Sequence, residues 1–382
     1  MFTTIYTDKL ASRSETSVRK LTDRTQKVNL DFSSNDYLGF SKNQCLLNSG
    51  LEASRKYGIG STGSRLLSGN NDLFMQFESE IATCKNTESA LIFNSGFQCN
   101  AFVLSSLLDQ KTLKCKPVVF FDRLNHSSLY QAVFLSGATL IRYKHNDFEH
   151  LSSLISSNEY SQRPKFIVTE TVFGMDGDIT PLDQIANIAR KYNALLYLDE
   201  AHATGVTGKN GYGLSTTVDL SGITTVTMGT FGKALGSSGA YIASDKSIIN
   251  YLVNFCPGFI YSTANSPFVI GAAREAWRLL PSIASQRKSL TKNSDYLRIK
   301  INEIGLDYGN STTNIVPIII GEEDLTEYVA QNLMTHGIKV SCIKPPTVSP
   351  GTSRIRIAIC THHSKKDIDK LVEALRCIKI KE

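Results

Sequence analysis

Short apolar runs alternate with amphipathic stretches between residues 88 and 245. The amphipathic stretches, such as PLDQIANIARKY, repeat apolar residues at the spacing of one helix face, and the apolar runs have the length of strands. Nearly all-apolar strands separated by helices are typical of a parallel sheet covered on both faces. The pattern predicts a doubly wound α/β core that binds its ligands at the carboxyl ends of the strands. The predicted strands are SALIF, PVVFF, TLIRY, FIVTE, ALLYLDE, TTVTM and GAYIAS.

The pattern changes after this core. A long helical stretch from Pro267 to Ile304 leads to the strand NIVPIIIG, a helix that ends at Gly337, the runs IKVSCI and SRIRIAIC, and a final helix. This order predicts a small α+β domain. We expect three parts: an N-terminal segment of a helix and a short strand (1–45), a large domain (46–280) and a small C-terminal domain (281–382).

Composition and charge narrow the function classes. With 41% hydrophobic residues the 382-residue chain can bury a sizeable core, and its formal charge of +6 is scattered, which argues against nucleic-acid binding. No apolar run is long enough to span a bilayer, and the first residues lack the apolar stretch of a secretory signal. The eight cysteines form no C-x-x-C pair. They indicate thiols in a reducing compartment, so we expect a cytoplasmic protein without a metal site.

Two charged residues follow buried strands. Asp199, in LLYLDEAHATG, stands where an apolar strand ends, and a carboxylate there is costly to bury without a cation. A protonated pyridine nitrogen would be such a cation, and His202 is close enough to share the site. Lys233, in GTFGKALG, can form an imine with a cofactor aldehyde, and the flanking glycines allow close approach. Taken alone, a helix-capping aspartate and a surface lysine are the commoner interpretations.

Further polar positions follow the other predicted strands. Asn94-Ser95-Gly96-Phe97 leads straight into a helix whose free N–H groups suit a phosphate. His126 could stack on a planar cofactor, although a lone histidine in such a loop is more often a cap. Because Gly96, His126, Glu170, Asp199 and Lys233 all follow successive strands, we expect them to face one crevice.

Ordered motifs along nearly the whole chain resemble the α-oxoamine synthase family of pyridoxal-phosphate enzymes. These motifs are LDFSSNDYLGF, GIGSTGSRLLSG, FNSGFQCN, DRLNHSS, TETVFGMDGD, LDEAHATGVTG, TFGKALGSSGAY and IYSTANSP. The resemblance implies an aspartate-aminotransferase-like fold and a homodimer with active sites at the subunit interface. It also implies a site residue by residue: Lys233 as the Schiff-base lysine, Asp199 on the pyridine nitrogen, His126 on the ring, His202 at the ring oxygen, Glu170 near the cofactor, Gly96, Phe97 and Thr230 around the phosphate, and Ser262 and Thr263 reaching it from the other subunit.

The C-terminal segment KPPTVSPGTSRIRI is most similar to family members that condense L-alanine with a pimeloyl thioester in biotin biosynthesis, releasing carbon dioxide. The thioester is carried by coenzyme A or by acyl carrier protein. The resemblance implies that Arg356 holds the amino acid carboxylate and that Thr347, Asn35 and, less securely, Arg19 contact substrate. In the implied mechanism alanine displaces Lys233, whose amine then removes the α-proton.

Two positions depart from the family pattern. Gly174 stands where related synthases often carry a serine that touches the cofactor, and Lys344 replaces an arginine before PPTV. The lysine keeps the charge but loses bidentate geometry, which puts substrate preference in doubt. A sister activity, above all 2-amino-3-ketobutyrate ligase with glycine and acetyl-CoA, is the alternative. A catalytically silent protein on the same fold is disfavoured by the complete lysine, aspartate and histidine set.

Overall fold

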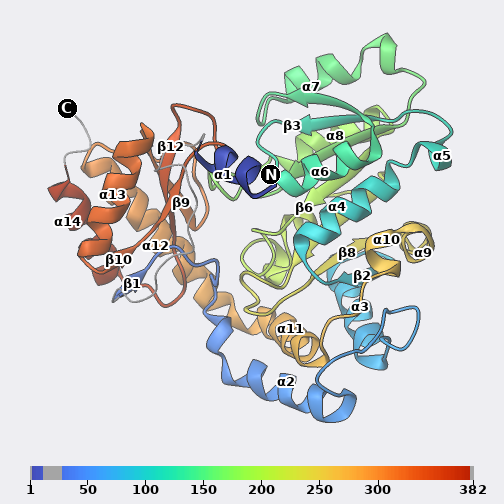
Figure 1. The fold of residues 1–382 in the computed structure, drawn as a ribbon, viewed down its shortest axis with the longest axis horizontal. Coiled ribbons are helices and arrows are strands. Elements are labelled where there is room, and N and C mark those ends of the chain that lie inside the picture. The colour runs from blue at the N-terminus through green and yellow to red at the C-terminus, as the bar shows by residue number, and fades with distance from the viewer. Residues whose placement is uncertain (1, 12–27, 379–382) are drawn as a thin grey trace. The chain divides into compact units, whose positions relative to one another are not determined.

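The computed structural model describes residues 2–11 and 28–378 (Figure 1). The chain divides into two compact units. The large unit comprises Asn35–Gly174 and Asp178–Ser289, and the small unit comprises Met1–Ser34, Met175–Gly177 and Leu290–Glu382. Residues 2–11 and 28–34 thus belong with the C-terminal residues, and the bounds 1–45, 46–280 and 281–382 stay a prediction.

A seven-stranded sheet forms the centre of the large unit, in the order β2-β8-β7-β6-β5-β3-β4. All neighbouring strands pair in parallel except β8, which pairs antiparallel with both β2 and β7. The short segment 231–239 joins β7 to β8, and a parallel crossover needs a longer connection. The predicted mostly parallel sheet is confirmed. The strands are β2 (Ser89–Phe93), β3 (Val118–Asp122), β4 (Thr139–Tyr143), β5 (Lys165–Glu170), β6 (Leu195–Asp199), β7 (Thr225–Thr230) and β8 (Ala240–Ser244).

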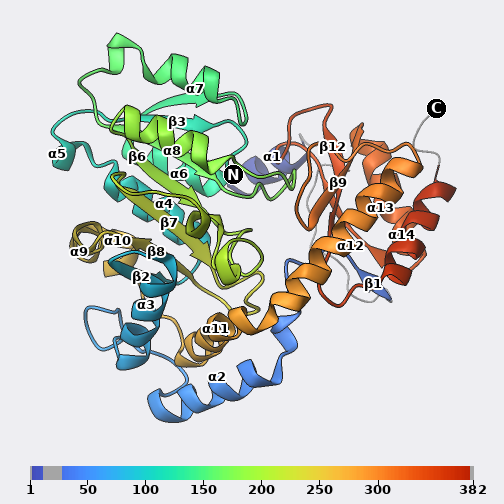
Figure 2. The same ribbon diagram turned by 180° about the vertical axis from the view of Figure 1, so that it is seen from behind.

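Helices cover both faces of this sheet (Figures 1 and 2). Successive residues of β3 show why: Val119 and Phe121 pack into the apolar cluster that includes α4, α6, α9 and α10, whereas Val118 and Phe120 pack into the cluster that includes α7 and α8. Strands buried on both faces must be apolar throughout. The helices are α2 (Gln44–Tyr57), α3 (Asp72–Lys85), α4 (Gly96–Leu107), α5 (Gln110–Leu113), α6 (Ser127–Ser136), α7 (Phe148–Ile155), α8 (Leu182–Lys191), α9 (Lys246–Phe255), α10 (Pro257–Ile260) and α11 (Pro267–Leu279).

The small unit is an α+β structure, as predicted. Its antiparallel sheet has the order β11-β12-β9, and a parallel pair joins β1 to β10. The run IKVSCI forms two strands, β10 and β11, which lie in different sheets. The elements are α1 (Phe2–Ala11), β1 (Leu30–Asp31), β9 (Ile315–Gly321), α13 (Glu323–Thr335), β10 (Ile338–Lys339), β11 (Ser341–Ile343), β12 (Ser353–Ala358), α14 (Lys365–Cys377) and α12 (Ala284–Glu303), whose first residues belong to the large unit.

Three general features bear on function. All eight cysteines are free thiols. Within residues 2–11 and 28–378, no helix combines the length and apolarity needed to cross a membrane. The same residues contain no group of three or more His, Cys, Asp or Glu side chains able to hold a metal ion.

Candidate active site

The carboxyl ends of six strands lie at one edge of the large sheet. Because β8 runs opposite to both β2 and β7, those two strands run in the same direction, as do β6, β5, β3 and β4. Parallel strands that end together create the crevice in which doubly wound proteins bind ligands. The predicted site residues of this unit follow these ends: Gly96 after β2, His126 after β3, Glu170 at the end of β5, Asp199 at the end of β6, and Thr230 and Lys233 at and after the end of β7.

Asp199 is a buried carboxylate, 3% exposed. Its Oδ2 accepts a hydrogen bond from Asn100 Nδ2 (2.7 Å) and its Oδ1 accepts the main-chain N–H of Ala201 (2.8 Å). Among the described residues it takes part in no ion pair. Hydrogen bonds compensate only part of the cost of burying a charge. A protonated pyridine nitrogen would supply the missing cation, so Asp199 fits a pyridoxal cofactor.

Glu170 is the register partner of Asp199 on the neighbouring strand. Burial, and then the negative charge of Asp199, raises the pKa of Glu170 well above its ordinary value. The positive charge of Lys233 and the main-chain N–H groups of His126 and Gly174 oppose this shift. Burial therefore favours the protonated form of Glu170, and its carboxyl group links two loops of the site.

Lys233, His202 and Tyr37 form a connected row. The Lys233 Nζ lies 2.7 Å from His202 Nε2, and Tyr37 Oη lies 2.8 Å from His202 Nδ1. Tyr37 Oη also donates to Asn35 Oδ1 at 3.1 Å, so this predicted substrate residue contacts the same row. Gly174 lies against the histidine: a Cβ atom at that position would collide with His202 Nε2. Lys233 and Asp199 thus both belong to the edge where the strands end, as a shared cofactor requires.

His126 is the N-cap of α6, where its Nδ1 accepts the Ser128 N–H (3.3 Å) and lies 2.8 Å from Ser128 Oγ. Desolvation by the surrounding protein lowers the pKa of His126, Asp199 opposes this effect, and the Lys233 charge adds to it. The ring is therefore neutral at pH 7. The capping role and the predicted stacking role are compatible, since a cap uses one ring edge and stacking uses a ring face.

A phosphate-sized anion fits the start of α4. Ser95 caps the helix, and the first-turn N–H groups at Gly96 and Phe97 have no helical partner by geometry. A Cβ atom on Gly96 would lie 3.9 Å from Thr230 Oγ1, so the Thr230 hydroxyl faces this turn. Ser262 Oγ accepts from Gln98 Nε2 (2.5 Å), and Thr263 O accepts from Asn94 Nδ2 (2.7 Å). Ser262 and Thr263 thus contact this helix start in their own chain, and their contact from a partner subunit stays a prediction.

The remaining predicted substrate residues lie elsewhere in the chain. Arg356 is buried on β12 and Thr347 is exposed between β11 and β12, both in the small unit. Arg19 lies outside the described residues. Lys344, one of the two departures from the family pattern, donates from Nζ to Glu327 Oε2 at 2.6 Å. The roles of these residues stay predictions.

Sequence reasoning missed the residues that hold the site together. Asn100 donates to Asp199 and to Ser128 Oγ (2.9 Å) and accepts from the Tyr197 hydroxyl (2.9 Å). The helical spacing gave only half of this contact: an asparagine one turn after Gly96 faces the same direction as that residue, but the spacing does not show which strand ends beside it. Nothing in the local sequence could connect Tyr37 to His202, which is 165 positions away.

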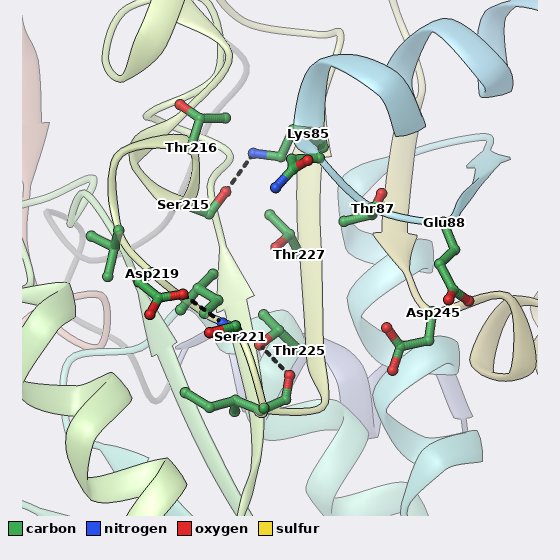
Figure 3. Close-up of a pocket in the computed structure, with 15 residues that line it drawn as sticks. Lys85, Thr87, Glu88, Ser215, Thr216, Asp219, Ser221, Thr225, Thr227 and Asp245 are labelled. Carbon is green, nitrogen blue, oxygen red and sulfur yellow. Dashed lines mark hydrogen bonds between the residues drawn. The ribbon is translucent and has the colours of Figure 1, made fainter.

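The large unit also contains a polar cavity of about 620 Å³ that is not this site (Figure 3). It is lined by the first residues of β7, by Asp245 after β8, by residues 85–88 before β2 and by residues 215–223. Figure 3 shows Lys85 bonded to the Ser215 hydroxyl on one side of it, at 2.7 Å, and Glu88 beside Asp245 on the other. None of the predicted site residues lines this cavity.

Comparison with known proteins identifies the family. The model of the class I and II aminotransferases matches residues 27–375, so the chain belongs to that family. The family and the site together give pyridoxal phosphate as the cofactor, as the sequence predicted.

Individual relatives agree with this assignment. An 8-amino-7-oxononanoate synthase of Gluconacetobacter diazotrophicus is 42% identical over 348 residues, which are 91% of this chain and 87% of that protein. A Paramagnetospirillum magneticum protein with the provisional name of such a synthase is 45% identical, with the same coverage. The crystal structure of the Francisella tularensis 8-amino-7-oxononanoate synthase has a TM-score of 0.79 and 29% identity, covering 93% of this chain and 98% of that one. The resemblance seen in the sequence is confirmed.

Proposed function

We propose that this chain condenses L-alanine with a pimeloyl thioester, releasing carbon dioxide and the thiol carrier, to give 8-amino-7-oxononanoate. The observation that carries the proposal is the meeting of Lys233, His202 and the buried carboxylate of Asp199 at one sheet edge. The names of relatives at 42–45% identity support the particular reaction. So does the segment KPPTVSPGTSRIRI, which carries Thr347 and Arg356.

The proposed cofactor contacts follow from the chemistry of the donors. Lys233 would hold the aldehyde carbon covalently through its amine, and Asp199 the pyridine nitrogen. His126 would cover one ring face and His202 would donate to the ring oxygen. The start of α4 and the Thr230 hydroxyl would bind the phosphate. When bound, pyridoxal phosphate supplies an electron-accepting ring that stabilises negative charge on the attached carbon.

The chain's own residues then control protons and orientation. Asp199, oriented by Asn100 and the Ala201 N–H, would favour the protonated pyridine nitrogen, because a buried carboxylate is stabilised by a cationic neighbour. The Lys233 Nζ accepts the α-proton of the amino acid, and His202 holds this amine in place from 2.7 Å. Arg356 would bind the substrate carboxylate through its guanidinium fork. Arg19, Asn35 and Thr347 are proposed to contact substrate.

A product assay tests the proposal. Purified protein with pyridoxal phosphate is offered L-alanine, glycine or L-serine, each with pimeloyl-CoA, pimeloyl-acyl carrier protein, acetyl-CoA or palmitoyl-CoA, and the aminoketone is identified by mass. The expected product is 8-amino-7-oxononanoate from alanine and one or both pimeloyl donors. Preferred turnover of glycine with acetyl-CoA would replace the proposal with a 2-amino-3-ketobutyrate ligase activity.

We also propose a homodimer. Ile59, Leu67 and Tyr261 expose 85%, 82% and 84% of their surfaces, and apolar residues that are exposed together mark protein–protein contacts. Their loops are joined by the Ser64–Thr263 bridge and by the bond from Ala264 N–H to Gly63 O (2.9 Å), so they form one patch. Sedimentation of the wild type should give twice the chain mass, and Leu67→Lys should shift it toward the monomer. A wild-type monomer at micromolar concentration would contradict this proposal.

The thiols favour a reducing compartment, and we propose the cytoplasm. All eight cysteines are free, including the buried Cys99, Cys256 and Cys360. Disulfides form and persist in oxidising compartments, where so many thiols would be unusual. A fluorescent fusion found in the periplasm or outside the cell would contradict this localisation.

A further inference from the structure

A histidine outside the described site bridges two buried carboxylates. His145 follows β4, with Nδ1 3.0 Å from Asp122 Oδ1 and Nε2 2.7 Å from Asp178 Oδ2. Asn146 reinforces both contacts: its N–H donates to Asp122 Oδ2 (3.0 Å) and its Nδ2 to Asp178 Oδ2 (3.0 Å). Asp122 and Asp178 are 0% and 6% exposed, so each needs such partners. Since both ring nitrogens face carboxylate oxygens, the ring carries two protons and a positive charge.

The charge of this ring is stable over the physiological range. Burial alone lowers the pKa of His145, but the hydrogen bonds from Asp122 and Asp178 outweigh it and raise the pKa to about 10. Tyr143, which also senses the charge of Asp122, stays protonated because burial raises its pKa further. The His145 ring therefore keeps its positive charge at neutral pH and stays bonded to both aspartates.

The cluster contacts both arms of the loop that follows β5. The first arm is residues 171–173, and the second arm is residues 178–180. The arms pair through the Val172–Ile179 bridge and the bonds Phe173 N–H to Asp178 O (3.1 Å) and Thr180 N–H to Thr171 O (3.0 Å). His145 bonds to the second arm at Asp178. It also contacts the first arm, where the Phe173 ring meets the imidazole edge to face, with centroids 4.4 Å apart. The position of this loop therefore depends on His145.

The same loop forms a wall of the cofactor site. Gly174 follows Phe173 directly, and its N–H donates to the buried Glu170 carboxyl. Its Cα lies so close to the His202 ring that a Cβ atom would collide with Nε2, the atom that contacts Lys233. A shift of the loop by a fraction of an ångström would release or displace this ring.

We propose that His145 is a positioning residue for the reaction: by tying Asp178 to Asp122 it holds Phe173 and Gly174 against His202 and so fixes the geometry of the His202–Lys233 pair. Gly174 has no side chain, so the backbone itself confines the imidazole. The proposal rests on the proposed function only in assuming that Lys233 holds pyridoxal phosphate.

The test compares wild type with His145→Gln, which keeps a polar side chain but cannot bridge two carboxylates as a cation. His150→Gln is the matched control, since the His150 ring accepts a main-chain hydrogen bond from Lys144 (3.0 Å) and bridges no carboxylates among the described residues. Asp178→Asn, which preserves volume and one hydrogen bond, replaces His145→Gln if that variant does not fold. The measurements are the pH titration of the near-visible absorbance of bound cofactor, kcat and KM for alanine, and the melting temperature.

We expect His145→Gln to shift the spectral midpoint by about half a pH unit or more. Its kcat should fall about tenfold through misplaced groups, with KM for alanine nearly unchanged. His150→Gln should match wild type. If His145 only stabilised the fold, its replacement would lower the melting temperature and change nothing else. An unchanged spectral midpoint and kcat in the folded variant would therefore overturn the positioning role.

Gly174→Ala tests the last contact directly. The added methyl group must displace His202, so the same spectral shift is expected with little loss of melting temperature. A spectrum and kcat like those of wild type would overturn the proposed contact between the loop and His202. A wild-type protein that shows neither bound-cofactor absorbance nor product would instead contradict the proposed function, so the two failures are distinguishable.

Discussion

At the scale of the residue, the centre of the site is a pair of buried carboxyl groups. Asp199 and Glu170 stand side by side on neighbouring strands, and burial, followed by the negative charge of Asp199, raises the pKa of Glu170. Desolvation makes two neighbouring carboxyl groups energetically unfavourable in the protein without its cofactor. We therefore expect the free energy of unfolding to rise when the cofactor binds, because its cationic ring stabilises the buried carboxylate.

Lys233→Ala should remove both the near-visible absorbance of bound cofactor and turnover. A general base contributes about 10²–10⁴-fold to a rate, and the covalent hold on the cofactor is lost as well, so we expect kcat to fall about a thousandfold or more. Steady-state assays and absorption spectra of the purified variant measure this. Lys209→Ala, on an exposed turn, serves as the control. Retention of both signals by Lys233→Ala would exclude this lysine from the mechanism.

Asn100→Ala should destabilise the large unit by about 1–3 kcal/mol, because Asp199 and the Tyr197 hydroxyl lose buried hydrogen-bond partners. Urea unfolding followed by the fluorescence of Trp277, the single tryptophan, measures the free energy of unfolding. The control is Asn48→Ala on the exposed face of α2. Equal stability of the two variants would show that the Asn100 contacts contribute nothing net. A weaker affinity for pyridoxal phosphate is expected alongside, since Asp199 loses its orientation.

At the scale of the element, α4 performs two tasks with one face. Its first turn offers N–H groups to an anion, and Asn100, four residues after Gly96, holds Asp199 from the same side. Residues four apart on a helix point in the same direction. The sequence predicted the first task from FNSGF, because strand–turn–helix is a local signal. The second was not predictable, because it depends on which strand ends beside the helix.

The packing of α2 on α11 depends on two glycines. A Cβ atom on Gly271 would lie 2.6 Å from Ala53 Cβ, and one on Gly50 would lie 2.8 Å from the Phe268 ring. Gly271→Leu should therefore force the helices apart and destabilise the fold by about 1–3 kcal/mol. Thermal unfolding compares it with Asn48→Leu, which adds the same side chain on the exposed face of α2. No difference between them would mean that the two helices can separate at no cost.

At the scale of the whole molecule, folding stability should depend on pH through buried histidines. Burial, and then the charge of His362, lowers the pKa of His363 to about 4. Its Nδ1 accepts the Cys360 N–H (3.0 Å), which a protonated ring could not do. Between pH 6.5 and about 4 the unfolded chain binds the proton and the folded chain does not. The stability from this residue is therefore present above pH 6.5 and is lost as the pH falls through about 4.

His363→Gln removes this titration. Its free energy of unfolding should fall less steeply than that of wild type between pH 6.5 and 4, when both are measured in urea. Parallel curves would show that the His363 ring titrates normally in the folded protein.

The sequence by itself determined the kinds of elements and their order. Apolar runs gave all seven strands of the large sheet, because strands buried on both faces must be apolar throughout. The cofactor followed from the resemblance of the ordered motifs, those around Lys233 and Asp199 among them, to a known family. The reversed direction of β8 was not predicted, nor was the joining of β1 to β10, because strand pairing is decided by packing between distant segments.

Only the tertiary structure decided which residues support the chemistry. Tyr37 at His202, Asn100 at Asp199 and His145 between two aspartates each join positions far apart in the chain. A buried polar group must find its partner wherever the fold brings one, and that partner leaves no periodic or local trace in the sequence.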